Sequence, residues 1–192
     1  MSSHFYAYLS RMKLIKRWSL MRNTVPENIA EHSLQVAVIA HALAVIGNLY
    51  FAGDIDARHV ALLAMYHDAG EVLIGDLPTP VKYFNPQIKE AYGQIEMVAK
   101  QKLLHMLPPE MAEIYRPLLF AAEDNEYRLI KAADKIAAYL KCVEEGASGN
   151  GEFAQAEPAL LAELEKFADI PAVAYFIQHF APSFSKTLDE LE

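Results

Sequence analysis

Helical periodicity constrains this chain most strongly, because apolar residues recur three and four positions apart through almost its whole length. No stretch alternates apolar and polar residues for long enough to predict a β-sheet. We therefore expect an all-α fold of about seven or eight helices. The spacing and the helix-stop signals place them at about residues 5–15, 28–47, 56–70, 85–107, 110–120, 126–146, 157–168 and 171–180.

The chain shows no sign of division into parts. Its 192 residues contain no internal repeat and no linker rich in Gly, Pro or Ser, so residues 1–192 are expected to form a single domain. The segment GDLPTP at 75–80 is predicted to be a loop, because its two prolines end a helix. The segment GASGNGEF at 146–153 is predicted to be a surface loop.

Composition argues against several classes of protein. Cys142 is the only cysteine, and the first twenty residues lack the continuous apolar core of a signal peptide, so we expect a soluble, cytoplasmic protein. The uninterrupted apolar runs are far shorter than a membrane span, so no membrane partner is expected. The net charge of −8 argues against binding to a nucleic-acid polymer.

Charge is unevenly distributed, since the first 22 residues carry five Lys or Arg residues and no Asp or Glu. Such a stretch could bind a small anion, although charge alone favours a solvated helix face. Within it, Arg17 could hold a phosphate through its planar guanidinium, and Trp18 could wall a pocket for a sugar or a base. The alternative is that Trp18 anchors the first helix with Arg17 packed beside it.

Three predicted helices each direct one metal-capable side chain toward the interior. His32, His67 and Asp134 lie three or four residues from apolar positions on the same helical face, and Asp68 follows His67 directly. Two histidines and two aspartates form a mixed nitrogen and oxygen set that suits a divalent transition-metal ion. The four residues together therefore favour a metal site.

Each of these residues alone is more simply explained as a hydrogen-bonded core group. A buried Asp134 could also be neutralised by Lys131 or Lys135. Adjacent residues such as His67 and Asp68 diverge by about 100° on a regular helix. Both can reach one ion only if the helix ends there, which the following glycine and loop would allow.

Two further acids follow the histidine–aspartate pair. Glu71 would share a helical face with His67 and Asp68, and a carboxylate beside a metal can take up or deliver a proton. The alternative for Glu71 is a surface charge at a helix C-terminus. Asp76 could accept a hydrogen bond from a sugar hydroxyl, or it could simply form the turn ahead of Pro78.

The motifs EHS around His32, HD at His67–Asp68 and AADK around Asp134 resemble those of the HD-domain metal-dependent phosphohydrolases. The wider pattern is similar to the bacterial YfbR-type 5′-deoxynucleotidases over nearly the whole chain. It includes RWSLMRN, ENIAEHSLQVA, LLAMYHDAGEVLIGDLPTPVKYFN, AADKIAAYLKC and PSFSKTLDE. This resemblance implies an all-α HD fold, a homodimer, and hydrolysis of deoxyribonucleoside 5′-monophosphates to deoxynucleoside and phosphate.

The resemblance also implies a role for each matching residue. One divalent ion, with cobalt, manganese or copper as the expected activator, would be held by His32, His67, Asp68 and Asp134. Glu71 would be the catalytic acid or base, where many other HD hydrolases carry Lys, and Arg17 would orient the phosphate. The implied substrate contacts are Arg17, Trp18, His67, Asp76, Leu77, Pro78, Thr79 and Asp134.

Three alternatives to this function stay open at the level of sequence. The protein could be an HD phosphohydrolase that acts on another phosphorylated nucleotide. It could be a nucleotide sensor that binds without turnover. It could also be a helical scaffold in which the histidines and aspartates are hydrogen-bonded core groups.

Overall fold

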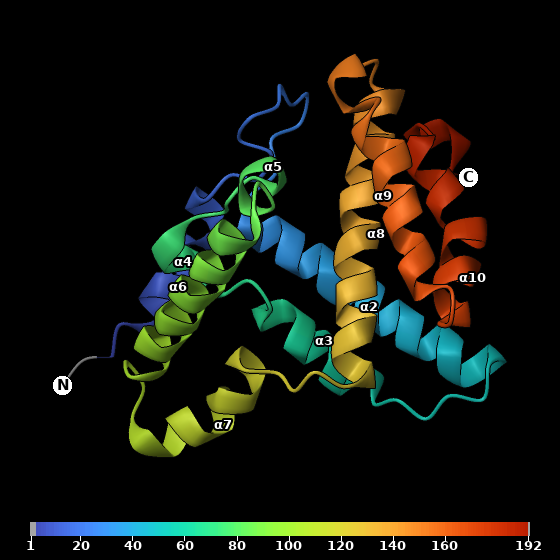
Figure 1. Cartoon of the computed structure of the whole chain (residues 1–192). Helices are drawn as coiled ribbons and strands as arrows, with labels where there is room; N and C mark the ends of the chain where they lie inside the picture. The colour runs from blue at the N-terminus through green and yellow to red at the C-terminus, as the bar shows by residue number, and fades with distance from the viewer. Residues whose placement is uncertain (1–2, 192) are drawn as a thin grey trace.

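The computed structural model describes residues 3–191, and this part of the chain is helical with no named strand (Figure 1). The all-α prediction is therefore confirmed. The helices with nine or more residues are α2 (Ile29–Tyr50), α3 (Ala57–Tyr66), α6 (Pro86–Leu104), α7 (Pro109–Leu119), α8 (Asn125–Ala147), α9 (Ala156–Leu164) and α10 (Pro171–His179). Shorter elements are α1 (Phe5–Leu9), α4 (Glu71–Ile74), α5 (Thr79–Lys82) and the 3₁₀ helices η1 (Ser10–Leu14), η2 (Gly151–Phe153), η3 (Glu165–Phe167), η4 (Ala181–Ser185) and η5 (Leu188–Glu190).

The main core forms around α2, which packs against α3, α8 and α10. Small residues such as Ala40 on α2 and Ala133 on α8 are completely buried, so the helix backbones approach closely. Larger side chains such as Leu43 and Ile136 fill the space between them, and each stabilises the fold by about 1.5–3 kcal/mol through burial. The helices that carry His32 and Asp134 are thus fixed against each other.

The apolar character of α2 follows from this central position. Its most apolar 18 residues have a mean hydropathy of 1.6, which is enough to cross a membrane by length and composition alone. However, 56% of that window is buried inside the protein, as in the core helix of a soluble protein. The predicted absence of a membrane partner stays a prediction.

α2 begins close to residue 28, as the sequence predicted, and a capping box fixes this start. The side chain of Asn28 accepts hydrogen bonds from the backbone N–H groups of Ala30 (3.0 Å) and Glu31 (3.1 Å). The carboxylate of Glu31 accepts one in return from the Asn28 N–H (3.1 Å). Because the helix begins at a defined residue, His32 faces the interior one turn later.

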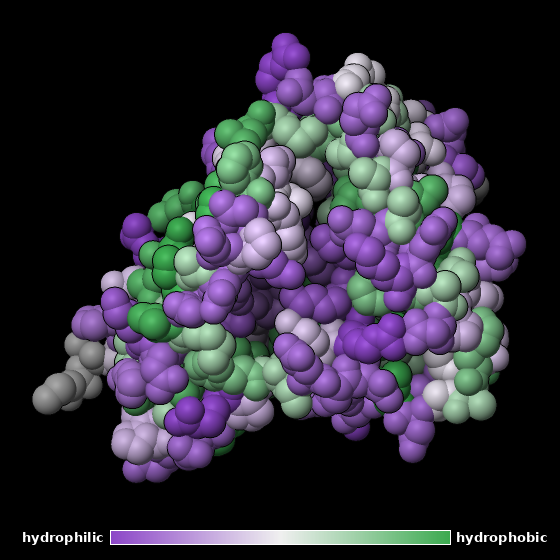
Figure 2. Space-filling view, in the orientation of Figure 1, coloured by the Kyte–Doolittle hydropathy of each residue, from purple (hydrophilic) through white to green (hydrophobic). Residues whose placement is uncertain are grey.

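A second, smaller core lies under α1, α6 and α7 and includes Phe5, Leu103, Leu104 and Leu119. Figure 1 shows α1, α4, α5 and α6 on one side of the molecule, α8, α9 and α10 on the other, with α2 and α3 crossing between them. Figure 2 shows a hollow with a hydrophilic lining between these two sides.

Two predicted elements around the functional motifs differ from the structure. The helix expected over 56–70 ends at Tyr66, residues 67–70 form a turn, and α4 starts at Glu71. The predicted loop at 75–80 ends at Pro78, because Thr79 begins α5. Pro80 fits there because the first turn of a helix does not need its missing N–H group. The sequence rule failed because it treats every proline as a helix stop.

Two other boundaries were also predicted wrongly. The first helix is shorter than 5–15, because the chain tightens into the 3₁₀ helix η1 after Leu9. The stretch 146–153 is not wholly a surface loop, since α8 continues to Ala147 and Phe153 is only 1% exposed. Phe153 packs against the ring of Trp18, with 5.3 Å between ring centroids.

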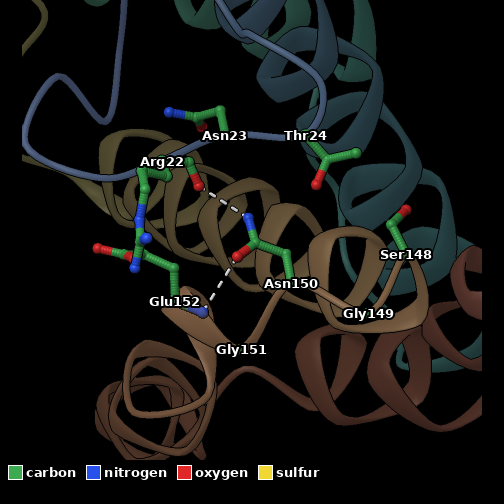
Figure 3. Close-up of a pocket in the computed structure, with 8 residues that line it drawn as sticks. All are labelled: Arg22, Asn23, Thr24, Ser148, Gly149, Asn150, Gly151 and Glu152. Carbon is green, nitrogen blue, oxygen red and sulfur yellow. Dashed lines mark hydrogen bonds and ion pairs between the residues drawn. The ribbon is translucent and has the colours of Figure 1, made fainter.

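The loop after Trp18 is tied to the end of α8 by a buried carboxylate. Glu145 is 2% exposed, accepts hydrogen bonds from the N–H groups of Thr24 (2.8 Å) and Val25 (3.1 Å), and forms an ion pair with Lys141. Asn150 donates to Glu145 (2.7 Å) and to the carbonyl of Arg22 (2.7 Å), and Figure 3 shows this second bond. These contacts fix the course of the loop.

Replacement Glu145→Gln should lower the free energy of unfolding by about 3–5 kcal/mol, because it leaves the Lys141 ammonium buried without its counter-ion. Urea unfolding measures this change, and Glu144→Gln, an exposed neighbour, is the matched control with an effect within about 0.5 kcal/mol. Equal stability of the two variants would contradict the prediction.

The same contact predicts a dependence on pH. Burial acts to raise the pKa of Glu145, but the Lys141 ammonium, Asn150 and the backbone donors hold it well below the usual range. A lowered pKa in the folded state contributes stability above the unfolded pKa, and this contribution is lost as the pH falls toward the folded value. Glu145→Gln should therefore lose less stability on acidification than the wild-type protein.

Candidate metal centre and active site

His32 lies at the centre of the candidate site. It is completely buried on α2, and its Nε2 atom lies 3.1 Å from Oδ1 of Asp134 on α8 and 3.5 Å from Oδ2 of Asp68. Neither ring nitrogen makes a hydrogen bond within the described chain. The imidazole therefore faces carboxylate oxygens that come from two other parts of the fold.

The end of α3 brings His67 and Asp68 to the same place. Because α3 stops at Tyr66, these two residues lie in a turn and do not diverge as they would on a regular helix. His67 Nδ1 lies 2.7 Å from the carbonyl oxygen of Ala64, which can only accept, so Nδ1 carries the proton. His67 Nε2 is then a lone-pair atom, and it lies 3.0 Å from Oδ2 of Asp68.

These four residues fit a divalent transition-metal ion. Ligand atoms of His32, His67 and Asp68 all lie within 4.8 Å of one another, and Asp134 borders the group through His32. Burial acts to raise the pKa of Asp68 and of Asp134, but the two histidines hold both values well below the usual range. Both carboxylates are therefore ionised beside two imidazole groups, and this mixed set of nitrogen and oxygen atoms suits a divalent cation.

Neither lysine proposed as a partner of Asp134 forms an ion pair with it. Lys135 pairs with Glu163 at 3.2 Å, because its side chain leaves the helix in a different direction from that of Asp134. Lys131 lies over the ring of Tyr127, with Nζ 5.1 Å from the ring centroid. The lysine alternative is therefore wrong for Lys135. Burial acts to lower the pKa of Lys131, but Tyr127 and the charges of Asp134 and Asp68 raise it without a direct ion pair.

Arg17 lies at the edge of the site, and its side chain is only 13% exposed. Its Nη1 atom is 4.0 Å from Oδ2 of Asp68, and its Nε donates to Oε2 of Glu27 at 3.4 Å. Burial acts to lower the pKa of Arg17, but Glu27, Asp134 and Asp68 raise it above its ordinary value. A charged guanidinium beside the carboxylates is not a solvated helix face, so that alternative was wrong for Arg17.

Trp18 follows in the loop after η1, with a backbone φ of +57°. This left-handed conformation costs a non-glycine residue about 1–2 kcal/mol. Its indole N–H donates to Glu27 (2.8 Å), and its ring packs against Phe153. Trp18 is therefore held beside Arg17 by specific contacts and lies outside the first helix.

Glu71 is the first residue of α4 and is 8% exposed. Its Oε2 atom is buried and has no hydrogen-bond partner within the described residues. Burial, together with Asp68 and Asp76, raises the pKa of Glu71 to about 10. The alternative of a surface charge at a helix C-terminus was wrong, because the helix breaks before Glu71 and a second helix starts with it.

The segment from Gly75 to Thr79 borders the same region. Gly75 has a φ of +78°, which favours glycine, and its carbonyl accepts a hydrogen bond from the hydroxyl of Tyr92 on α6 (3.1 Å). Asp76 is half-buried, and burial raises its pKa. Leu77 and Pro78 are half-buried and Thr79 is exposed, so their contacts with a substrate stay predictions.

Sequence reasoning missed Glu27, which contacts Arg17, Trp18 and His32. Glu27 precedes α2 and lies outside any periodic segment, so no helical face marked it. Only its position between the Arg–Trp pair and His32 could have drawn attention to it.

A sequence model of YfbR-like 5′-deoxynucleotidases matches residues 4–184. The chain belongs to this family. It is 56% identical over 191 residues to the 5′-deoxynucleotidase YfbR of Shigella boydii, covering 98% of this chain and 96% of that protein. It is 55% identical over 192 residues to a 5′-deoxynucleotidase of Vibrio cholerae, covering 98% of both chains.

Solved structures confirm the HD fold. An HD-domain phosphohydrolase from Listeria innocua has a TM-score of 0.83 at 24% identity, covering 94% of this chain and 88% of that one. A cyanophage S-2L HD phosphohydrolase, bound to dA and one catalytic Zn²⁺ ion, has a TM-score of 0.66 at 20% identity, covering 92% and 96%. The two TM-scores support a shared fold.

Added Mn²⁺ or Co²⁺ should raise the melting temperature of the metal-free protein, because an ion bound only by the folded state stabilises it by about 2.7 kcal/mol at one hundred times its Kd. Scanning calorimetry with and without chelator measures this shift. Asp68→Ala should abolish the shift, whereas Asp54→Ala, at an exposed position, should keep it. An equal shift in both variants would contradict the assigned site.

Proposed function

We propose that this chain is a metal-dependent 5′-deoxynucleotidase that hydrolyses deoxyribonucleoside 5′-monophosphates to deoxynucleoside and phosphate. The observation that carries the proposal is the cluster of His32, His67, Asp68 and Asp134, in a chain that is 56% identical over 191 residues to a 5′-deoxynucleotidase. Family membership supports the reaction, and the cluster supports the dependence on metal.

The four residues of this cluster would hold one divalent ion through two nitrogens and carboxylate oxygens. When bound, such an ion lowers the pKa of a water ligand and polarises a phosphoryl oxygen. Resemblance favours cobalt, manganese or copper. The cyanophage protein, which has the same fold, binds one catalytic Zn²⁺ ion, so an HD fold can hold a divalent ion of this kind.

Arg17 is proposed to bind and orient the phosphate. Its guanidinium is largely buried and positively charged, and it lies next to Asp68 at the edge of the cluster. Its planar fork can donate two parallel hydrogen bonds to phosphate oxygens and stabilise the charge that they carry during transfer. The bond from Nε to Glu27 leaves the two terminal nitrogens for this role.

Glu71 is proposed to move the proton that the reaction requires, at its buried Oε2 atom. This atom has no hydrogen-bond partner among the described residues, although it is removed from solvent. In its protonated form this carboxyl group can deliver a proton to the departing 5′ oxygen, and as a carboxylate it can take one from the attacking water. A protein that bound nucleotide without turnover would not need a carboxyl group at this position.

The sugar and base are proposed to contact Trp18 and the segment Asp76–Thr79. Asp76 can accept a hydrogen bond from the sugar hydroxyl, and Leu77, Pro78 and Thr79 would close over the nucleotide. His67 and Asp134 would contact the nucleotide near its phosphate group. The rigid wall of Trp18 near C2′ would leave a ribose hydroxyl crowded or unpaired, which disfavours ribonucleotides.

Two alternatives are less well supported. A purely structural role would leave the buried histidines hydrogen-bonded, whereas the Nε2 atoms of both His32 and His67 have no such partner in the described part of the chain. Action on a different phosphorylated nucleotide would make the strong similarity to two 5′-deoxynucleotidases difficult to explain.

Phosphate release from deoxyribo- and ribonucleoside 5′-monophosphates with the same base tests the function. With Mn²⁺ or Co²⁺, release from the deoxy substrate should be at least about tenfold faster than from its ribo counterpart, because only the latter carries the 2′-hydroxyl. A chelator should stop phosphate release from both substrates. Equal phosphate release from both nucleotides would contradict the proposal that Trp18 disfavours the 2′-hydroxyl. No release from either nucleotide would overturn the proposed 5′-deoxynucleotidase function.

Glu71→Gln is the variant that separates chemistry from binding in this assay. It should bind metal and nucleotide as the wild-type protein does, but its kcat should fall by about 10²–10⁴-fold, because the amide cannot exchange the proton. Full turnover with metal bound would remove Glu71 from the mechanism.

The protein is further proposed to act as a homodimer that buries the outer face of α2 and α3. This face exposes Leu34 (59%), Val38 (62%), Leu62 (41%) and Met65 (45%). Leu34 and Val38 lie one turn apart on α2, and α3, which carries the other two, packs against α2. Exposed apolar side chains on adjacent helices favour burial against a second protein surface. A second copy of the chain is the partner that the family resemblance implies.

Val38→Glu should convert the dimer to a monomer in sedimentation velocity, because it would bury two unpaired carboxylates in the interface. Val98→Glu, an equally exposed position on α6, is the matched control and should leave the dimer intact. A wild-type monomer, or a dimer in both variants, would contradict this interface.

A further inference from the structure

Glu27 lies where the N-terminal segment meets the start of α2. The backbone N–H of Arg17 donates to the carbonyl of Glu27 (3.0 Å), and the N–H of Ile29 donates to the carbonyl of Ile15 (3.0 Å). This short antiparallel pairing sets Glu27 beside Arg17 and Trp18, while His32 follows one turn into α2. The side chain of Glu27 is only 12% exposed.

Nitrogen atoms of three side chains converge on this carboxylate. Oε2 accepts hydrogen bonds from Trp18 Nε1 (2.8 Å) and Arg17 Nε (3.4 Å). Oε1 lies 3.5 Å from Nδ1 of His32, which is buried and makes no hydrogen bond within the described chain. Glu27 therefore joins the substrate-side pair to a residue of the metal cluster.

We propose that Glu27 is a positioning residue that fixes the tautomer of His32 and holds Arg17 and Trp18 in place. This inference rests on the roles proposed above for those three residues. Glu27 itself touches neither the cluster of ligand atoms nor, in this proposal, the nucleotide. It acts through the groups that do.

The tautomer of His32 depends on the donors and acceptors around its ring. Among the described residues, Oε1 is the acceptor that faces Nδ1 of His32, which favours the tautomer with its proton on Nδ1 and the Nε2 lone pair directed toward Asp68 and Asp134. The other tautomer would place a proton on Nε2, where a metal ion must bind. A carboxylate oxygen that faces Nδ1 therefore prepares His32 as a ligand.

A glutamine at this position cannot satisfy all three donors. Its amide has one accepting oxygen and one NH₂ group that only donates. If the oxygen faces Trp18 and Arg17, the NH₂ group opposes Nδ1–H of His32 and favours the wrong tautomer. If the amide is turned round, the NH₂ group opposes the indole N–H. One of the two connections is lost in either orientation.

The backbone of Trp18 makes this loss measurable. Its φ of +57° persists because several contacts hold the residue, including the bond to Glu27, the packing on Phe153 and a hydrogen bond from Asn23 to its carbonyl (3.3 Å). Trp18 is the only tryptophan in the chain, so intrinsic tryptophan fluorescence reports this one side chain.

Glu27→Gln tests the proposal, with Glu31→Gln as the matched control. Glu31 is an exposed carboxylate at the same helix start, and its side chain accepts a hydrogen bond from the backbone N–H of Asn28. Titration calorimetry with Mn²⁺ should give a Kd for Glu27→Gln that is about 10- to 100-fold weaker than that of the wild-type protein. The emission of Trp18 should also shift and become easier to quench with acrylamide. The control should change neither quantity.

His32→Ala separates this inference from the proposed metal site. If His32→Ala loses Mn²⁺ binding while Glu27→Gln keeps wild-type Kd and emission, the site stands and the role of Glu27 is overturned. If His32→Ala binds Mn²⁺ as the wild-type protein does, the proposed site fails, and the metal part of the Glu27 role fails with it. Weaker binding together with altered emission in Glu27→Gln alone supports the whole proposal.

Discussion

The structure depends on one completely buried imidazole that is surrounded by carboxylates. His32 has oxygens of Glu27, Asp68 and Asp134 within 3.5 Å, and these residues come from three separate parts of the chain. So many acids around one histidine would repel one another in an apolar interior unless cations compensate them. Arg17 supplies one positive charge at the edge, and a divalent ion between the ligand atoms would supply the rest.

This constraint explains several features of the fold. The capping box fixes where α2 begins, the end of α3 at Tyr66 turns His67 and Asp68 inward, and the small residues of α2 and α8 bring Asp134 close. Glu145 then anchors the loop that carries Arg17 and Trp18 to the other end of α8. Asp134 and the loop that carries the proposed phosphate-binding residue are thus both fixed by α8.

Local information in the sequence was sufficient for much of this. Periodicity located the long helices, and polar residues on apolar faces identified His32, His67 and Asp134 as inward-facing. The break after Tyr66, the helical start at Thr79 and the burial of Phe153 could not be predicted this way, because they depend on packing between distant segments. Glu27 and Glu145 were missed for the same reason, since their partners lie in segments that only the folded chain brings together.

Anomalous diffraction from crystals grown with Mn²⁺ or Co²⁺ tests the central claim most directly. The account predicts one strong peak in each protein chain, bound by Nε2 of both His32 and His67 and by carboxylate oxygens of Asp68 and Asp134. It also predicts that Glu27 then lies within hydrogen-bond distance of Nδ1 of His32. A peak at any other group of residues, or a filled site in which His32 is not a ligand, would contradict it.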